Sequence, residues 1–204
     1  MNFTYQSLHA VPVTKPGPHN ARELRTHQGI PGIERIESGR LFATWYPGGT
    51  SECRENYAML SVSDNDGQSW TDAVAVVDPP HPDVRAFDPT LWLAPNGKLY
   101  WFWAQGCAGE DGVSGLTDEV FDGLVGVWYA ILENPGDAPE HFHFTVPRRI
   151  SNGIMLNKPI VLSDGTWALP CSLWSVKSKN RARHESLHPV YGAMMVVSED
   201  DGES

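Results

Sequence analysis

Three segments of the sequence contain a proline that is preceded by polar side chains. His27 and Arg85 each stand four residues before such a proline, and Asp88 and Lys158 each stand one residue before one. Histidine titrates near neutral pH and suits general acid–base catalysis, whereas arginine binds a carboxylate through two parallel hydrogen bonds. This combination is typical of a site that binds an acidic ligand and moves a proton.

Acidic and aromatic residues in or beside the long predicted loops complete the set of candidates. Glu55 lies in the first of these loops, with Glu52 close by as another acid. Trp103 and Trp174 end predicted strands, where an indole ring can stack on a sugar, and Gln105 follows Trp103. The candidate catalytic residues are His27, Glu55 and Asp88, and the candidate substrate-binding residues are Arg85, Gln28, Trp103, Gln105, Asn157, Lys158 and Trp174.

Each candidate also has an explanation that involves no function. His27 could be a surface histidine that is hydrogen-bonded within a loop, and Arg85 could form an ion pair with Asp83 or Asp88. Trp103 could be a core residue, because large aromatic side chains are highly buried on average. The sequence alone leaves the functional and the structural interpretation open for each of these residues.

The candidates are positioned by a repeat in which a proline is followed by an apolar strand, a glycine turn and a second apolar strand. A turn glycine supplies a positive φ without strain, which suits a tight hairpin. The predicted hairpins span 31–46, 89–103 and 159–169, and the strands predicted after them span 57–62 and 73–77, 126–131 and 142–146, and 191–197. Four strands per repeat are typical of a propeller blade, so the sequence predicts an all-β propeller of four-stranded antiparallel blades.

Two copies of a serine–aspartate turn motif stand after predicted third strands. Residues 63–70 read Ser-Asp-Asn-Asp-Gly-Gln-Ser-Trp, with Asn65 in the acidic place, and residues 198–204 repeat the pattern up to the second serine. An Asp or Asn side chain in such a turn caps backbone N–H groups, and the glycine adopts a positive φ. On these motifs the chain resembles the sialidase-like superfamily with Asp-box (BNR) repeats.

The resemblance implies a particular architecture. Members are commonly propellers of about six blades, so about three blades are expected here, at about 29–78, 86–150 and 156–204, with residues 1–25 as an N-terminal strand or arm. The Asp boxes are structural, lie on the face opposite the active site, and place Trp70 between strands.

The same resemblance implies where the site lies. The inner strands begin near the propeller axis on the active face, so we expect the residues before the three prolines to converge there: His27, Arg85, Asn157 and Lys158.

The function implied by the resemblance is hydrolysis of a glycosidic bond at an acidic sugar, as in an exo-sialidase, without a metal or cofactor. Sialidases place an arginine two residues before the first of these prolines, where this chain has Gly29. Their acid/base aspartate belongs in the first upper loop, where this chain has Glu52 and Glu55, and their other two arginines, the nucleophilic tyrosine and its glutamate partner lie in later blades. Two alternatives stay open. One is a uronic-acid polysaccharide lyase with His27 as base and Arg85 as carboxylate partner, and the other is a non-catalytic sugar-binding propeller.

Composition narrows the partners and the compartment. The formal net charge is −10 and the pI is about 5.1, which disfavours nucleic acid and anionic membranes as partners. The sequence shows neither a signal peptide nor an apolar run of membrane-spanning length, so it predicts a soluble cytoplasmic protein. Cys53, Cys107 and Cys171 have no metal-ligand spacing and are expected to be reduced, buried thiols.

The two ends of the sequence carry expectations of their own. Residues 7–13 read as a strand, which is expected to complete the last blade of the propeller. The sequence stops inside the second serine–aspartate motif, so an incomplete propeller is expected, unstable and inactive by itself. Its open sheet faces are expected to expose Val161, Leu162, Met195 and Val197.

Overall fold

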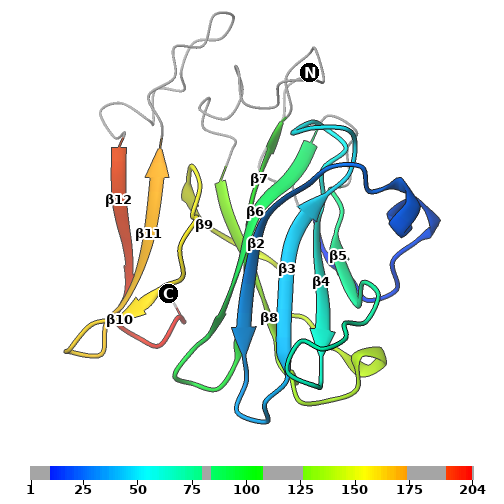
Figure 1. Ribbon diagram of the computed structural model, residues 1–204. Helices are drawn as coiled ribbons and strands as arrows, with labels where there is room; N and C mark the ends of the chain where they lie inside the picture. Colours follow the sequence, from blue (N-terminus) through cyan, green and yellow to red (C-terminus); the bar gives the residue numbers. More distant parts are fainter. Residues whose placement is uncertain (1–9, 80–83, 108–125, 174–191, 204) are drawn as a thin grey trace, which may run out of the picture.

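The computed structural model describes residues 10–79, 84–107, 126–173 and 192–203, which form an all-β fold of three antiparallel sheets (Figure 1). The first sheet contains β1 (Pro12–Val13), β2 (Gln28–Arg35), β3 (Leu41–Pro47), β4 (Ala58–Ser63) and β5 (Ala75–Val77). The second contains β6 (Val84–Leu93), β7 (Leu99–Cys107), β8 (Gly126–Leu132) and β9 (Arg148–Asn152). The third contains β10 (Ile160–Val161), β11 (Trp167–Leu173) and β12 (Gly192–Ser198).

The helical segments of the described residues are single 3₁₀ turns: η2 (Pro18–Asn20), η3 (Arg22–Leu24) and η4 (Pro139–His141). Among these residues, no helix has the length and apolarity needed to cross a membrane. The sheets follow one another in chain order and do not close into a ring within the part of the chain that the structure describes (Figure 1).

The three predicted hairpins are confirmed as β2–β3, β6–β7 and β10–β11, each antiparallel. One predicted strand is wrong. Residues 142–146 contain a single bridge, between Phe144 and Leu132, and β9 takes the outer position in the second sheet instead. Pro139 and Pro147 flank this segment, and a proline has no N–H to donate to a strand ladder.

The cores lie between neighbouring sheets, and β7 contributes to both. Trp101 and Trp103 pack with Phe42 and Leu60 of the first sheet, whereas Tyr100 and Phe102 pack on the other side with residues of the third sheet. This alternation follows from the two-residue period of a strand, in which successive side chains point to opposite faces. The second sheet is therefore the central layer.

The inner strands β2 and β6 share an irregularity at the same place. The register shifts between Gly29 and Gly32 in β2, and between Phe87 and Thr90 in β6. In each case the residue before the proline is not glycine but has a positive φ, of 25° at Ile30 and 45° at Asp88. A bulge of this kind redirects side chains, and positive φ in other residues than glycine is costly and often marks functional sites.

The two serine–aspartate turns have the same geometry. The hydroxyl of Ser63 accepts a hydrogen bond from the Gly67 N–H at 3.0 Å, and that of Ser198 accepts one from the Gly202 N–H at 2.9 Å. Asn65 Oδ1 accepts the Ser69 N–H at 2.9 Å, as expected for a side chain that caps its own turn.

The prediction that Trp70 is buried between strands is wrong, because 40% of this residue is exposed. The ring lies with Trp45, Ala43 and Ser61 on the face of the first sheet that points away from the second sheet. This face is covered over Met59 and Val76, which are buried, but not over Trp70, so the indole keeps contact with solvent.

The described part of the predicted N-terminal strand pairs within the first sheet. Pro12 and Val13 pair with Val77 and Val76 of β5, which makes β1 the outermost strand of the first sheet. His19 Nε2 lies 2.7 Å from Asp78 Oδ2 and ties the following segment to the same edge. The arm therefore extends the first sheet.

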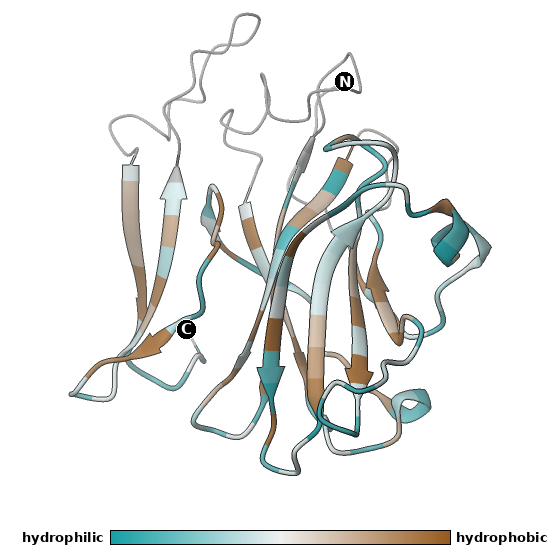
Figure 2. Ribbon diagram, viewed as in Figure 1, coloured by the Kyte–Doolittle hydropathy of each residue, from teal (hydrophilic) through white to brown (hydrophobic). Residues whose placement is uncertain are grey.

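The outer face of the third sheet is apolar and uncovered by the described residues. Ile160, Met195 and Val197 are 55%, 56% and 51% exposed, and Val161 and Leu162 are 44% and 41% exposed. Figure 2 shows β10 as hydrophobic along its length although it lies at the edge of the molecule. The expectation that this sheet exposes apolar side chains is confirmed.

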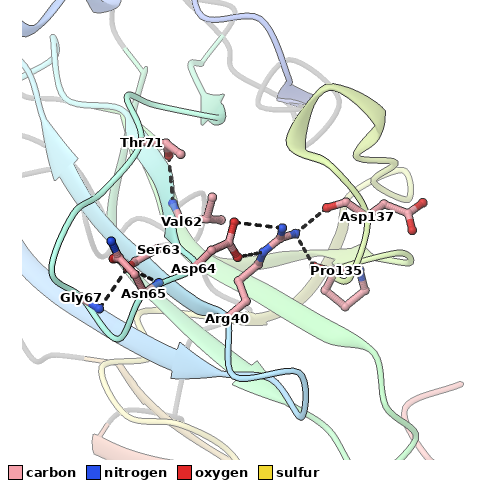
Figure 3. A network of polar contacts seen from close by, with 9 residues as sticks. All are labelled: Arg40, Val62, Ser63, Asp64, Asn65, Gly67, Thr71, Pro135 and Asp137. Carbon is pink, nitrogen blue, oxygen red and sulfur yellow. Dashed lines mark hydrogen bonds and ion pairs between the residues drawn. The ribbon is translucent and has the colours of Figure 1, made fainter.

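Arg40 links the first sheet to the second (Figure 3). Its Nε donates to Asp64 Oδ1 at 2.6 Å and its Nη2 to Asp64 Oδ2 at 3.2 Å, while Nη1 donates to the carbonyl oxygens of Pro135 and Asp137. The hydrogen bond from Arg40 lowers the pKa of Asp64. One side chain, 13% exposed, thus joins the β2–β3 turn, the Ser63 turn and the loop after β8.

Arg40→Ala is expected to lower the free energy of unfolding by about 1–3 kcal/mol, because two carbonyl groups and a carboxylate lose their charged donor. Arg35→Ala is the matched control. Arg35 forms an ion pair with Asp66 in which both side chains are largely exposed, so its loss should cost at most about 1 kcal/mol. Chemical denaturation compares the two variants, and an equal loss in both would contradict the link described for Arg40.

Candidate functional site

Arg85 lies at the start of β6 and is the most unusual side chain of the fold, because only 1% of it is exposed. Its Nη1 donates to Asn56 Oδ1 at 2.8 Å, and its guanidinium carbon lies 4.0 Å from the centre of the Phe87 ring. Nε and Nη2 have no hydrogen-bond partner among the described residues. These two donors share one edge of the guanidinium plane, the edge that binds carboxylates in a bidentate manner.

The loop between β3 and β4 is held beside Arg85 by Asn56, which is 1% exposed. Its amide nitrogen donates to the carbonyl oxygens of Gly48 and Ser51, and its Oδ1 accepts the Cys53 N–H at 2.8 Å as well as Arg85 Nη1. All hydrogen-bonding positions of the side chain are used. Asn56 therefore sets both the shape of this loop and the position of the guanidinium.

Glu52 is the acid that this loop brings to Arg85. Its Oε2 lies 3.8 Å from Arg85 Nη2, too far for a hydrogen bond, and its Oε1 accepts the hydroxyl of Tyr46 at 2.8 Å. Burial, and next the hydrogen bond to Glu52, raises the pKa of Tyr46, so its hydroxyl stays protonated. The Tyr46 ring also covers Gly29, where an added Cβ would lie 2.5 Å from Tyr46 Cζ.

Asp88 supplies the protonatable group of the cluster. It lies in the bulge of β6, is 9% exposed and has a φ of 45°. Burial raises the pKa of its carboxyl group to about 6, while the positive charge of Arg85 opposes this rise and the charge of Glu52 adds to it. A carboxyl group with this pKa changes protonation close to physiological pH, which suits general acid–base catalysis.

His27 lies beside the cluster. Its ring centre is 5.7 Å from that of Tyr46, its backbone N–H donates to Gly49 O at 3.0 Å, and its Nε2 is buried without a partner in the described part of the chain. The structure thus brings together His27, Arg85 and Asp88 of the predicted residues. The arrangement can bind an anion on Arg85 and exchange a proton through Asp88.

Other predicted residues lie elsewhere. Gln28 faces away from the second sheet, where it accepts a hydrogen bond from Trp45 Nε1 at 3.0 Å. Glu55 is exposed, with its Oε2 4.0 Å from Cys53 Sγ, so Glu52 takes the place expected for it. Gln28 points away because successive side chains of a strand alternate between its two faces. Glu55 lies in a loop, and its side chain turns away from Arg85.

Trp103 and Gln105 are not surface platforms. They are 1% and 0% exposed, and Trp103 Nε1 donates to Gln105 Oε1 at 2.9 Å inside the core between the first and second sheets. Odd-numbered residues of β7 point to this core, so neither side chain reaches an open face. Trp174 lies outside the described residues.

Lys158 contradicts the predicted convergence. Its Nζ donates to Glu34 Oε2 at 3.0 Å, and the same oxygen accepts the N–H of Leu93 at 3.1 Å. Glu34 and Leu93 lie near the ends of β2 and β6, whereas Arg85 lies at the start of β6. Lys158 and its exposed neighbour Asn157 therefore belong to the C-terminal ends of β2 and β6, where Lys158 joins the three sheets.

Two further expectations concern the cysteines and metals. Cys53 and Cys171 are free and buried, as expected, and the side chain of Cys107 lies outside the described part of the chain. Within the described residues, no group of three or more His, Cys, Asp or Glu side chains is arranged to hold a metal ion.

The comparisons with known proteins reveal a relationship in structure only. No family model matches the sequence, and no curated protein does. The solved structure titled Hadza microbial sialidase Hz136 superposes with a TM-score of 0.61 at 17% identity, over 89% of this chain and 37% of that chain. The chain has a sialidase-like fold.

A second solved structure agrees with this result. A protein of unknown function from Dyadobacter fermentans DSM 18053 superposes with a TM-score of 0.53 at 12% identity, over 86% of this chain and 52% of that chain. The chain thus spans less than two thirds of the length of either of these two proteins.

Three residues of the cluster were not among the predicted site residues: Tyr46, Glu52 and Asn56. Tyr46 reads as an ordinary aromatic residue at a strand end, and nothing in its neighbourhood signals a hydrogen bond to Glu52. Asn56 stands directly before a buried strand, a place where a polar side chain often organises a loop. This position is the only signal by which sequence reasoning could have found it.

Asp88 is expected to make stability depend on pH. The folded state holds the proton up to about pH 6 and the unfolded state releases it near pH 4, so the folded protein binds more protons in this window. Stability therefore falls as the pH rises from about 4 to 6 and is constant above. Asp88→Asn removes this contribution, so its stability should not fall in this pH range. The free energy of unfolding of the variant minus that of the wild type should therefore be about 3 kcal/mol larger at pH 7 than at pH 4.

Denaturant unfolding of both proteins at the two pH values measures this gain. A difference between wild type and variant that is the same at both pH values would show that Asp88 titrates normally.

Proposed function

We propose that this chain belongs to a carbohydrate-active enzyme that hydrolyses a glycosidic bond at an acidic sugar. The observation that carries the proposal is the buried guanidinium of Arg85, whose Nε–Nη2 edge lacks a hydrogen-bond partner among the described residues, beside the protonatable carboxyl of Asp88. The sialidase-like fold supports it, because a sialidase removes a sugar that carries a carboxylate. Fold alone does not decide the function, so the site carries the argument.

In this proposal each residue has a distinct role. The carboxylate of the sugar binds to the free edge of Arg85, and Asp88 donates its proton to the glycosidic oxygen as the bond between that oxygen and the sugar breaks. Water adds to the sugar carbon as a hydroxyl group, and its remaining proton returns to the carboxylate of Asp88, which restores the acid. Glu52, held by Tyr46, keeps the guanidinium oriented.

Gly29 separates this site from that of a true sialidase. The resemblance would place a carboxylate-binding arginine at this position, but the ring of Tyr46 occupies the space that a side chain would need. We therefore infer that the acidic sugar is held by Arg85 at the start of β6 instead.

We infer further that the three sheets are consecutive blades of a propeller and that the serine–aspartate turns are Asp boxes. Two exposed sheet faces support this inference. The first sheet exposes Ile33 and Trp70 on the side away from the second sheet, and the third exposes Met195 and Val197. Faces of this kind bury apolar area against a further blade, worth about 25 cal/mol per Å2.

A uronic-acid lyase is the second candidate, favoured by the unpartnered Nε2 of His27. A lyase needs a base for the proton next to the carboxylate and a cation that neutralises the carboxylate, and His27 and Arg85 are of these types. The products separate the two reactions, since elimination creates an unsaturated sugar that absorbs ultraviolet light whereas hydrolysis does not.

The experiment uses the protein at its full natural length and pairs of aryl glycosides that differ only in a carboxylate, such as a glucuronide and a glucoside, together with an aryl sialoside. At least one acidic glycoside should be cleaved, and the neutral member of its pair should react at least about a hundred times more slowly. Arg85→Met should remove most of this preference. Cleavage of no acidic glycoside, or equal cleavage of a pair, would overturn the proposal.

A further inference from the structure

The Arg85 site contains more groups that can carry a negative charge than groups that can carry a positive charge. The described charged and titratable groups around the guanidinium are Tyr46, Glu52, Cys53 and Asp88, and those next to them are His27 and Glu55. Burial lowers the pKa of Arg85, and the nearby charge of Glu52 opposes this effect. Two carboxyl groups, Glu52 and Asp88, already interact electrostatically with the single cation.

The geometry leaves a place for a third carboxylate. Glu52 is held by the Tyr46 hydroxyl, and its Oε2 stays 3.8 Å from Arg85 Nη2, so it does not occupy the donor. Phe87 covers one side of the guanidinium and Asn56 takes Nη1, which leaves only the Nε–Nη2 edge. A buried donor edge without a partner costs free energy unless a ligand fills it.

A ligand carboxylate at this edge would put three carboxyl groups around one buried guanidinium. Like charges at such distances in a buried site cannot all stay ionised, and one of the groups takes up a proton. Glu52 is 35% exposed, and its Oε1 accepts a hydrogen bond from Tyr46. Asp88 is 9% exposed and has no hydrogen-bond donor of this kind in the described part of the chain.

We propose that the Arg85 site binds a carboxylate ligand together with one proton, and that Asp88 is the group that takes up this proton. The inference rests on the proposed function for the assignment of Arg85 as the carboxylate-binding residue, and it does not require that a bond be cleaved. Binding of the acidic sugar would then convert Asp88 to the protonated form that hydrolysis needs.

The linkage predicts a pH dependence of binding with a definite sign. Asp88 is already protonated in the free protein below about pH 6, where its pKa lies, so affinity is constant there. Above that pH the proton must be taken from solvent, and affinity falls about tenfold for each further pH unit.

Isothermal titration calorimetry with glucuronate as the probe tests the proposal on the full-length protein. Titrations at about pH 7.5 in buffers of different ionisation enthalpy count the protons taken up, and the expected count is close to one per glucuronate. At about pH 5 the count should approach zero. In Asp88→Asn the count at the higher pH should vanish, whereas His27→Gln should keep it.

Each outcome of the titrations supports or overturns the inference. Binding of glucuronate without proton uptake by the wild type, or uptake that persists in Asp88→Asn, would overturn the inference and leave the proposed function standing. Proton uptake without cleavage of any glycoside would support the inference and refute the proposed function. Absence of glucuronate binding would overturn the inference directly. The number of protons taken up by the wild type tests the inference even if a variant does not fold.

Discussion

Asparagine in place of Asp88 is expected to lower the rate of glycosidic cleavage by about two to four orders of magnitude. The amide keeps the size of the carboxyl group but cannot give its proton to the leaving oxygen. Since the pKa of Asp88 in the free protein is about 6, the wild-type kcat/KM should also fall as the pH rises above that value, because the free protein loses the proton-donating form.

Glu55→Gln is the matched control, because the carboxylate of Glu55 is exposed and belongs to the same loop as Glu52 without facing Arg85. Its cleavage rate and pH profile should equal those of the wild type. Steady-state rates over a range of pH compare the three proteins. An Asp88→Asn variant that cleaves within about tenfold of the wild type would exclude Asp88 as the proton donor.

Alanine at Gly48 is expected to destabilise the protein by about 4 kcal/mol, the largest loss that we foresee for a single methyl group. An added Cβ would lie 2.1 Å from the carbonyl oxygen of Glu55, which is backbone and cannot move aside, and the residue has a φ of 110°. Gly48 closes the loop that Asn56 organises, since its own carbonyl accepts the Asn56 amide at 2.8 Å.

Gly97→Ala separates the two causes of this loss. Gly97 has a positive φ of 78° but no atom within 4 Å of an added Cβ, so it carries only the backbone strain, about 1–2 kcal/mol. Thermal or denaturant unfolding gives both values. A Gly48→Ala variant no less stable than Gly97→Ala would mean that the loop next to Arg85 is packed differently.

The hairpins could be predicted because their signals are local. Turn glycines at 39, 97 and 165 all have a positive φ, and the apolar segments on either side pair as expected. The strand predicted at 142–146 failed for a reason that is not local to those residues. Its flanking prolines end the ladder, and Phe142 packs instead against Phe42 of the neighbouring sheet, with ring centres 6.0 Å apart.

The site could be predicted only in part, because position before a proline does not fix a residue's place along the inner strand. β2 and β6 begin before their prolines and pass through a bulge, so Arg85 lies at the N-terminal end of its strand. β10 begins only after Pro159, so Lys158 stays at the C-terminal end of β2 with Glu34. Arg85 and Lys158 thus lie at opposite ends of the inner strands because the strands begin at different points relative to their prolines. Where a strand begins depends on packing between the sheets.

The sequence offers both Glu52 and Glu55 as acids of the first loop and does not tell which of them lies beside Arg85. Neither Glu52 nor Glu55 follows a periodic pattern, because the loop is shaped by the hydrogen bonds of Asn56 and not by a strand or helix. Side-chain direction in such a loop is a property of the folded network, and the sequence offers no rule for it.

The central claim is that the Nε–Nη2 edge of Arg85 binds the carboxylate of an acidic sugar. A crystal structure of the full-length protein with bound glucuronate tests it most directly. The account predicts that the two carboxylate oxygens lie about 3 Å from Nε and Nη2, with the sugar ring next to Asp88. A glucuronate carboxylate held by other residues, with this edge of Arg85 paired to a side chain of the protein itself, would contradict the account.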